Sequence, residues 1–247
     1  RRRFAQHFLE PAWVDRLVRA VEPGPDETFL EIAPGRGALT FALAPRVRRL
    51  VAVEIDRDLA AGLSKRAPAN VEIVSGDILR ADLDIRLSGH WPVRVIGNLP
   101  YNISTPILFR LVDLARAGRC IRDATVMLQL EVADRLAARP GSRAWGVLGA
   151  CQQWRSGVER LFTLPPGAFR PAPKVHSAVV RLTYGPPRVT LPDPDAFDSV
   201  VREIFLHRRK VLSNAVLSLA RARNLDAVEV LRTAGIDRRR RPETLDL

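Results

Sequence analysis

The chain of 247 residues is poor in cysteine and histidine and has no long apolar run. Its two cysteines, Cys120 and Cys151, cannot build a disulfide framework and lack the spacing of metal ligands, which favours a reducing compartment. No apolar run approaches the roughly 18 residues of a membrane span, and no signal-peptide pattern opens the chain. The four histidines are scattered, away from other ligand types. We therefore expect a cytoplasmic protein with no membrane contact and no metal.

Lysine is also scarce, since 36 of the 39 basic residues are arginine, and the formal net charge is +12. Residues 23–102 hold ten basic and ten acidic residues, whereas residues 103–247 hold 24 and 14. An arginine-rich composition by itself can follow from genome base content. A positive charge that is concentrated in one part of the chain, however, suits a polyanionic partner such as nucleic acid better than a small neutral substrate.

Short β-branched or apolar runs alternate with helical spacing over the first two-thirds of the chain. The strand candidates are 28–33, 50–54, 71–75, 93–97 and 124–130. Between them lie helical patterns such as 56–67 and 104–118, and another follows near 131–154. This alternation is typical of a doubly wound α/β fold with a parallel sheet.

The last third of the chain is organised differently. Two further strand candidates, 158–164 and 177–184, flank a proline-rich loop and predict a hairpin added to the sheet edge. Residues 185–195 contain four prolines and read as a linker, and the rest is helical and basic. We therefore expect one large domain over 1–185 and a small helical domain over 186–247, in a monomer.

The ends of the first three predicted strands favour a crevice for a nucleoside-type cofactor. Residues 33–38, Ala-Pro-Gly-Arg-Gly-Ala, follow the first strand, and glycines there allow a ligand close to the backbone. Glu54 ends the second strand and can accept hydrogen bonds from a ribose diol, while Asp77 after the third suits an adenine amino group. The spacing is not the GxGxxG of nicotinamide enzymes. For Glu31, Glu54 or Asp77 alone, a solvated residue at a strand end is the favoured interpretation, whereas the three together with the turn that follows the fourth strand favour the cofactor.

The turn after the fourth predicted strand, Asn98-Leu99-Pro100-Tyr101, carries the chemistry. The amino group of adenine is a poor nucleophile, so a catalyst must hold both amino hydrogens by acceptors while the nitrogen attacks a methyl donor. The side-chain oxygen of Asn98 and the main-chain carbonyl of Leu99 can supply these acceptors. Pro100 restricts the backbone, and Tyr101 offers a flat face to an extruded base. A merely structural turn with a packed tyrosine explains Pro100 but not Asn98.

Seven segments, in order along nearly the whole chain, resemble the ribosomal RNA adenine dimethyltransferases of the KsgA type. They are AQHFL (5–9), EIAPGRGALT (31–40), VAVEIDRDL (51–59), SGDIL (75–79), VIGNLPYNISTPIL (95–108), FRPAPKVHSAVVRL (169–182) and HRRKVLSNAV (207–216). Related adenine N6-methyltransferases of DNA and RNA carry similar Asn-Leu-Pro-Tyr turns, whereas the proline-rich loop and the late Arg-Arg-Lys helix are more specific.

This resemblance implies both a fold and an activity. The fold is a Rossmann-like S-adenosylmethionine-dependent methyltransferase sheet with an added C-terminal hairpin, plus a small all-α C-terminal domain that binds RNA. The activity is dimethylation of N6 of two adjacent adenosines near the 3′ end of small-subunit rRNA during ribosome assembly, with S-adenosylmethionine as the methyl donor.

The resemblance also implies cofactor contacts. His7 and Leu9 line the entry side of the cofactor site, and Ala33 and Gly35 approach the amino-acid portion of the cofactor. Other implied contacts are those of Glu54 with the ribose, Asp77 with the adenine, and Asn98 with both cofactor and target. Ala33 stands where the family has the first glycine of its turn, and Ala5-Gln6-His7 replaces the family's Gly-Gln-Asn.

Substrate contacts are expected from two other regions besides Tyr101. Phe169, in the proline-rich loop, is similar to an aromatic residue that closes the other face of the target base, although a loop anchor explains it equally well. Arg208, Arg209 and Lys210 suit phosphate contacts, the alternative being a solvated helix face.

Three other functions stay open from the sequence. A large-subunit rRNA methyltransferase of the macrolide-resistance type shares the sheet and the turn. An RNA-binding assembly factor without methyl transfer is suggested by Ala33. A nicotinamide-dependent oxidoreductase is disfavoured because no residues resemble a hydride-transfer site.

Overall fold

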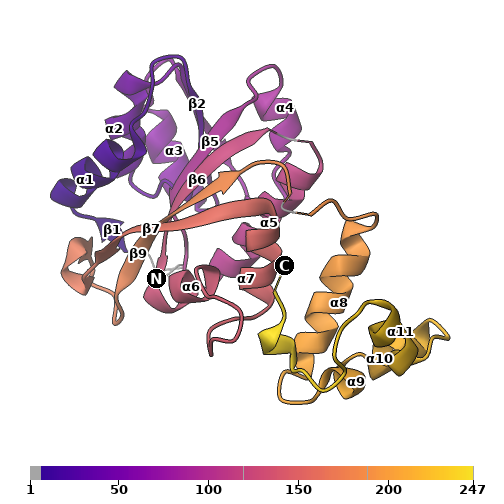
Figure 1. The fold of residues 1–247 in the computed structure, drawn as a ribbon. Helices are drawn as coiled ribbons and strands as arrows, with labels where there is room; N and C mark the ends of the chain where they lie inside the picture. Colours follow the sequence, from indigo (N-terminus) through magenta and orange to yellow (C-terminus); the bar gives the residue numbers. More distant parts are fainter. Residues whose placement is uncertain (1–6, 119, 188, 247) are drawn as a thin grey trace. The chain divides into compact units, whose positions relative to one another are not determined.

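The computed structural model describes residues 7–118, 120–187 and 189–246 (Figure 1). Ala5 and Gln6 of the AQHFL motif lie outside the described residues. The chain forms two compact units. The first contains the described residues up to Ala133 together with Gly157–Gly185, and the second contains Asp134–Ser156 together with the residues from Pro186 onward.

The first unit contains a seven-stranded sheet in the order β4-β3-β2-β5-β6-β9-β7. Its strands are β2 (Thr28–Ile32), β3 (Arg49–Glu54), β4 (Val71–Ser75), β5 (Val93–Asn98), β6 (Ile121–Gln129), β7 (Ser156–Leu164) and β9 (Ser177–Tyr184). The strands β2 to β6 pair in parallel, while β9 runs antiparallel to β6. The predicted Rossmann-like sheet with an added hairpin is confirmed. Strand β6 begins three residues before its predicted start because Arg122 and Asp123 interrupt the apolar run.

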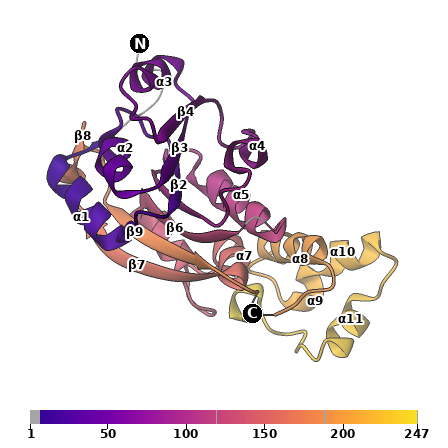
Figure 2. The same cartoon turned by 90° about the horizontal axis from the view of Figure 1, so that it is seen from above.

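Helices cover both faces of this sheet. They are α1 (Pro11–Val21), α2 (Ala38–Leu43), α3 (Arg57–Ser64), α4 (Leu83–Leu87) and α5 (Ser104–Arg116), with a 3-10 turn at Ala44–Arg46. Figures 1 and 2 show α1 and α2 on one face and α4 and α5 on the other. Local sequence sets the helix starts: Pro11 opens α1, and the carboxylate of Asp56 caps α3 by accepting from the N–H groups of Asp58 and Leu59.

The helical stretch expected near 131–154 is broken into two helices. Helix α6 (Leu130–Leu136) ends before Pro140 and Gly141, and α7 (Val147–Arg155) begins after Gly146. Proline and glycine cannot continue a helix without a penalty, so a single helix over this range is wrong.

A two-residue antiparallel pair links the beginning of the chain to the proline-rich loop. Strand β1 (Phe8–Leu9) pairs with β8 (Phe169–Arg170), Phe8 opposite Arg170 and Leu9 opposite Phe169. The main-chain N–H of Glu10 then donates to the carbonyl of Ala168, in the 3-10 turn Pro166–Ala168, at 2.9 Å. Sequence periodicity did not predict either strand, because two residues carry no alternation.

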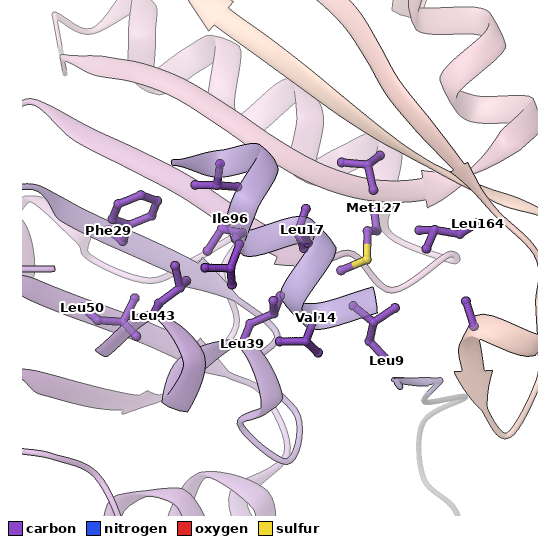
Figure 3. Packing of buried hydrophobic residues seen from close by; sticks show 14 of the residues in the cluster. Leu9, Val14, Leu17, Phe29, Leu39, Leu43, Leu50, Ile96, Met127 and Leu164 are labelled. Atoms are coloured by element: carbon purple, nitrogen blue, oxygen red, sulfur yellow. The ribbon is translucent and has the colours of Figure 1, made fainter. Parts of the chain in front are cut away.

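The hydrophobic core of the first unit lies between the sheet and helices α1 and α2 (Figure 3). Phe29, Ile96 and Met127 point from neighbouring strands toward Leu17 and Leu43 of the helices. All five side chains are buried. Burying a side chain of this size stabilises a fold by about 1.5–3 kcal/mol, so this face holds α1 and α2 in place.

The second unit is helical. Besides α7, its elements are α8 (Pro194–Leu206), α9 (Leu212–Ala215), α10 (Leu217–Ala222), α11 (Ala227–Thr233) and a 3-10 turn at Pro242–Thr244. Its core consists of Ile204, Leu212, Ala215, Val216, Ala220, Ala227 and Leu231. Within the described residues, no helix is long and apolar enough to cross a membrane.

Two tryptophans join the segment Asp134–Ser156 to the rest of the second unit. The indole N–H of Trp145 donates to the carbonyl of Leu245 at 3.0 Å, and that of Trp154 to the carbonyl of Val189 at 2.8 Å. Trp154 also packs on Phe197, with ring centroids 5.3 Å apart. These contacts group Asp134–Ser156, which the predicted first domain included, with the helices. The division of domains at 185/186 stays a prediction.

A buried ion network lies near the amino end of β5, away from the strand's Asn98 end. The guanidinium of Arg94 donates to Asp123 at 2.9 Å and to Glu27 at 2.8 Å, and its side chain is only 6% exposed. It also donates to the main-chain carbonyl of Val21 at the end of α1. One cation thus connects β5, β6 and α1.

We expect Arg94→Ala to lower the free energy of unfolding by about 3–5 kcal/mol, because it removes the guanidinium that lies 2.9 Å from the buried carboxylate of Asp123. Arg122→Ala is the matched control, since Arg122 pairs with the same Glu27 at 2.6 Å but is 59% exposed. That change should cost less than about 1 kcal/mol. Urea unfolding of both variants measures the difference, and equal losses would contradict the role of burial.

Candidate active site

A cavity of about 430 Å³ lies where β2, β3 and β5 end. Among its lining residues are nine of the predicted site residues, namely His7, Leu9, Ala33, Gly35, Glu54, Asn98, Leu99, Pro100 and Tyr101. The parallel pairing of the strands explains this grouping, because the carboxyl ends of parallel strands meet at one edge of the sheet.

The turn after β2 has a left-handed backbone. The φ angles are 56° at Ala33, 60° at Gly35 and 87° at Gly37. A Cβ atom on Gly35 would lie 3.1 Å from the Phe8 ring, and one on Gly37 would overlap the Leu63 side chain. Two glycines are therefore required by both conformation and space. Ala33, which has a Cβ, adopts a conformation that costs an ordinary residue about 1–2 kcal/mol.

Glu54 is buried at the end of β3 and fixed by two main-chain donors. Its Oε2 accepts from the N–H of Gly35 at 2.9 Å, and its Oε1 accepts from the N–H of Asp56 at 3.0 Å. A carboxylate has about four acceptor positions, so this one can still accept from a ligand's hydroxyl groups. The alternative of a solvated strand-end acid is wrong for Glu54, which is 2% exposed.

Asp77 lies beside this site but does not line the cavity described above. The N–H of Gly76 donates to the main-chain carbonyl of Glu54 at 2.8 Å, which places Asp77 next to the end of β3. The Asp77 carboxylate accepts from the N–H of Leu79 at 3.0 Å. Its contact with an adenine stays a prediction.

The side chain of Asn98 has a defined orientation. Its Nδ2 donates to the main-chain carbonyl of His7 at 2.7 Å, so its Oδ1 is left as an acceptor at the cavity. The N–H of Leu99 donates to the carbonyl of Met127 at 3.2 Å, which ties the turn to β6. The turn therefore begins with one fixed amide oxygen and a backbone anchored to the next strand.

Tyr101 is held at its hydroxyl and at its ring. Its hydroxyl is 2.6 Å from the hydroxyl of Ser177 in β9, and its ring stacks on His7 with centroids 5.6 Å apart and planes 26° apart. Burial raises the pKa of Tyr101, which keeps the phenol neutral. The Nδ1 of His7 lies 2.7 Å from the carbonyl of Pro171. His7 therefore contacts both the turn and the proline-rich loop.

Phe169 does not line this cavity. Its side chain is fully buried in the core of the first unit, beside the β1–β8 pair. The structure therefore favours the loop anchor, one of the two alternatives that the sequence left open, and a contact of Phe169 with a base stays a prediction.

The Arg-Arg-Lys segment belongs to the second unit and is not helical. Helix α8 ends at Leu206, and residues 207–210 form turns, with the N–H of Lys210 donating to the carbonyl of His207 at 2.8 Å. The predicted helix over these residues is wrong. The Nε of Arg208 donates to Glu243 at 2.7 Å, whereas Arg209 and Lys210 are exposed. The three cations are therefore not equivalent.

One acid in the cavity, Glu31, was not among the predicted site residues. It is 1% exposed on β2, where all five residues are buried, and its Oε2 accepts from the hydroxyl of Thr40 at 2.7 Å. Burial, together with the nearby charge of Glu54, raises its pKa to about 7. The sequence signal for a buried acid was its position inside the apolar run TFLEI. Its place near the end of the strand instead favoured an acid in contact with solvent.

Three features define a class of protein, the nucleoside-cofactor-dependent adenine methyltransferases. They are the parallel sheet, the cavity at its carboxyl edge, and Asn98 near an acid that suits a ribose. Comparison with known families agrees with this class and identifies one family within it. The whole chain, residues 1–247, matches the family described as Ribosomal RNA adenine dimethylase, and the chain belongs to this family.

Full-length relatives are similar in sequence. The chain is 43% identical over 254 residues to Ribosomal RNA small subunit methyltransferase A of Pseudomonas fluorescens, covering 100% of this chain and 90% of that protein. It is 45% identical over 229 residues to the protein of the same name in Xanthomonas euvesicatoria, covering 91% and 86% of the two chains.

Solved structures share the fold. A dimethyladenosine transferase from Plasmodium falciparum superposes with a TM-score of 0.81 at 23% identity, covering 97% of this chain and 93% of that one. The 23S rRNA methyltransferase ErmE superposes with a TM-score of 0.66 at 27% identity, covering 96% of each chain.

We expect Ala33→Gly to raise the free energy of unfolding by up to about 1 kcal/mol, because glycine adopts a positive φ without the steric cost. It should also tighten cofactor binding, since a methyl group leaves the cavity lining. Ala61→Gly, at an exposed position in the middle of α3, is the same chemical change, but it should lower the free energy of unfolding. Urea unfolding and calorimetry test the pair, and a loss of stability in Ala33→Gly would contradict the strain.

Proposed function

We propose that this protein transfers methyl groups from S-adenosylmethionine to N6 of two adjacent adenosines near the 3′ end of small-subunit rRNA during ribosome assembly. The observation that carries the proposal is the hydrogen bond from Asn98 Nδ2 to the His7 carbonyl, which leaves Oδ1 as the acceptor of a side chain that lines the cavity. Membership of the Ribosomal RNA adenine dimethylase family and relatives named small subunit methyltransferase A support it.

The cavity fits a nucleoside-type methyl donor. Gly35 leaves space where a Cβ would contact Phe8, and Glu54 keeps acceptor capacity for ribose hydroxyls. When bound, S-adenosylmethionine supplies an electrophilic methyl group on a positively charged sulfur. The protein's task is to hold this group and the acceptor nitrogen in line.

The Asn-Leu-Pro-Tyr turn activates the acceptor. Asn98 Oδ1 and the carbonyl of Leu99 accept the two amino hydrogens of an extruded adenine, which favours the pyramidal nitrogen of the transition state. No general base is required before the attack, because the nitrogen acquires its acidic proton only when the new bond forms. Tyr101, fixed by Ser177, supplies a ring against which the base can stack.

The large-subunit alternative has one supporting observation, the full-length similarity of this chain to the 23S rRNA methyltransferase ErmE. The relatives at 43–45% identity, however, are named as small-subunit enzymes. Incubating the protein and labelled S-adenosylmethionine with immature small subunits, or with large-subunit RNA, separates the two. Label in adenine of the small subunit alone is expected. No label with either substrate would favour the assembly factor. The monomeric state and the cytoplasmic location stay predictions.

We expect Asn98→Ala to lower methyl transfer at least 100-fold, roughly the loss seen when one donor or acceptor of a transition state is removed. The melting temperature should change little, because the side chain makes one hydrogen bond at the cavity edge. Asn98→Asp keeps an acceptor oxygen but loses the donor to His7, so an intermediate rate is expected. Wild-type turnover in Asn98→Ala would exclude the proposed role.

For RNA binding we expect Arg209→Ala with Lys210→Ala to weaken affinity and to reduce the slope of log K against log salt by about one for each lost phosphate contact. Arg57→Ala with Lys65→Ala removes the same charge from exposed positions of the first unit and serves as the control. Filter binding at several salt concentrations measures both. Equal slopes in the two double variants would show that charge alone, and not this turn, matters.

A further inference from the structure

Glu31 has no assigned part in the mechanism above, although it lines the same cavity as Asn98 and Glu54. In the register of the sheet it lies opposite Ala52 of β3 and Ile96 of β5. Each of these residues is two positions before a strand end, at Glu54 and Asn98 respectively. Glu31 therefore lies between the acid that suits the ribose and the amide that suits the acceptor base.

A buried carboxyl at this place is costly for the fold. Glu31 is 1% exposed, and its described hydrogen-bond donor is Thr40 of α2. The other ionisable groups that line the cavity are Glu54, Arg36, His7 and Tyr101. Glu54 repels a second negative charge, and Arg36 is exposed with its guanidinium 4.4 Å from the Phe8 ring centroid. Burial and Glu54 raise the pKa of Glu31 to about 7, so near neutrality the group is poised between its charged and neutral forms.

The methyl donor and its product differ in one charge at the sulfur. Both carry the same ribose, adenine and amino-acid groups, but the donor has a positively charged sulfonium and the product a neutral thioether. The positive α-ammonium is common to both, so its effect on Glu31 cancels in the comparison. The additional positive charge of the sulfonium favours the carboxylate form of Glu31 more than the neutral thioether does.

We propose that Glu31 is a specificity-determining residue that distinguishes the methyl donor from its demethylated product by the positive charge on sulfur. The inference rests on the proposed use of S-adenosylmethionine. Binding of the donor then ionises Glu31 and releases its proton. Loss of the methyl group removes the counter-charge, Glu31 takes a proton again from solvent, and the product is held less tightly.

Calorimetry with three ligands tests this at pH 6 and pH 8: S-adenosylmethionine, S-adenosylhomocysteine, and sinefungin, which has an ammonium group in place of the methyl sulfonium. We expect the wild type to prefer the two charged ligands over the thioether, and this preference should be stronger at pH 8 than at pH 6. With a pKa of about 7 in the free protein, the ionised fraction of Glu31 rises about tenfold from pH 6 to pH 8, so the preference should grow by up to about tenfold over this range. Glu31→Gln should reduce the preference about tenfold and make it less dependent on pH, leaving only titration of the ligands themselves.

A second readout does not need any ligand. The pKa of Glu31 is higher in the folded protein than in the unfolded chain, so the folded state binds more protons between about pH 4.5 and 7, and stability is lost as pH rises through this window. Glu31→Gln should therefore melt at a higher temperature than the wild type at pH 8, with the difference shrinking toward pH 5. Thr40→Val removes a donor to the carboxylate and should move the pH midpoint of the binding preference upward.

The matched control is Glu159→Gln, which removes one negative charge from an exposed position of β7. Its ligand preference should equal that of the wild type. The inference is overturned if Glu31→Gln weakens all three ligands equally, or leaves the preference unchanged, while the wild type binds S-adenosylmethionine. If the wild type binds none of the three ligands, the proposed function fails as well.

Discussion

The close approach of β5 to β2 is the constraint on which the site depends. A Cβ atom on Gly97 would lie 2.5 Å from the main-chain oxygen of Ile32, so only glycine permits the observed pairing at the carboxyl ends of these strands. This pairing brings Asn98, which follows Gly97 in the chain, to the same edge as the turn at Ala33. Without it the amide oxygen and the cofactor crevice would not belong to one cavity.

The amino ends of the strands contribute to stability and not to the site. Near the start of β5, Arg94 gathers carboxylates and a helix carbonyl into a buried network, while the carboxyl end of the strand carries the reacting groups. Stability and chemistry are therefore separated along one strand of six residues. The separation allows the carboxyl edge to keep an uncompensated acid, Glu31, and a left-handed Ala33, both of which oppose folding.

Much of this arrangement could be read from the sequence because it depends on local patterns. The apolar runs at 28–33 and 93–97 predicted strands, and Asn98 to Tyr101 predicted a turn with free acceptors. Contacts between residues that are far apart in the chain could not be predicted from local sequence patterns. Arg208 pairs with Glu243, 35 residues away, and Phe169 is buried opposite Leu9 in the β1–β8 pair. Neither contact has a signal in the local sequence of its two segments. Glu31 was misjudged because a strand end is usually wet, whereas here α2 supplies Thr40 over it.

The β1–β8 pair has a consequence for the order in which the protein is made. Leu9 and Phe169 are joined across 160 residues of chain, and His7 contacts Asn98 and Pro171 from the same short segment. A ribosome synthesising this protein must therefore release the proline-rich loop before the wall that contains His7 can be fixed. Until then the sheet can form from local strands and helices, but its crevice lacks one side. The crevice is therefore complete only after the chain has been synthesised as far as Pro171.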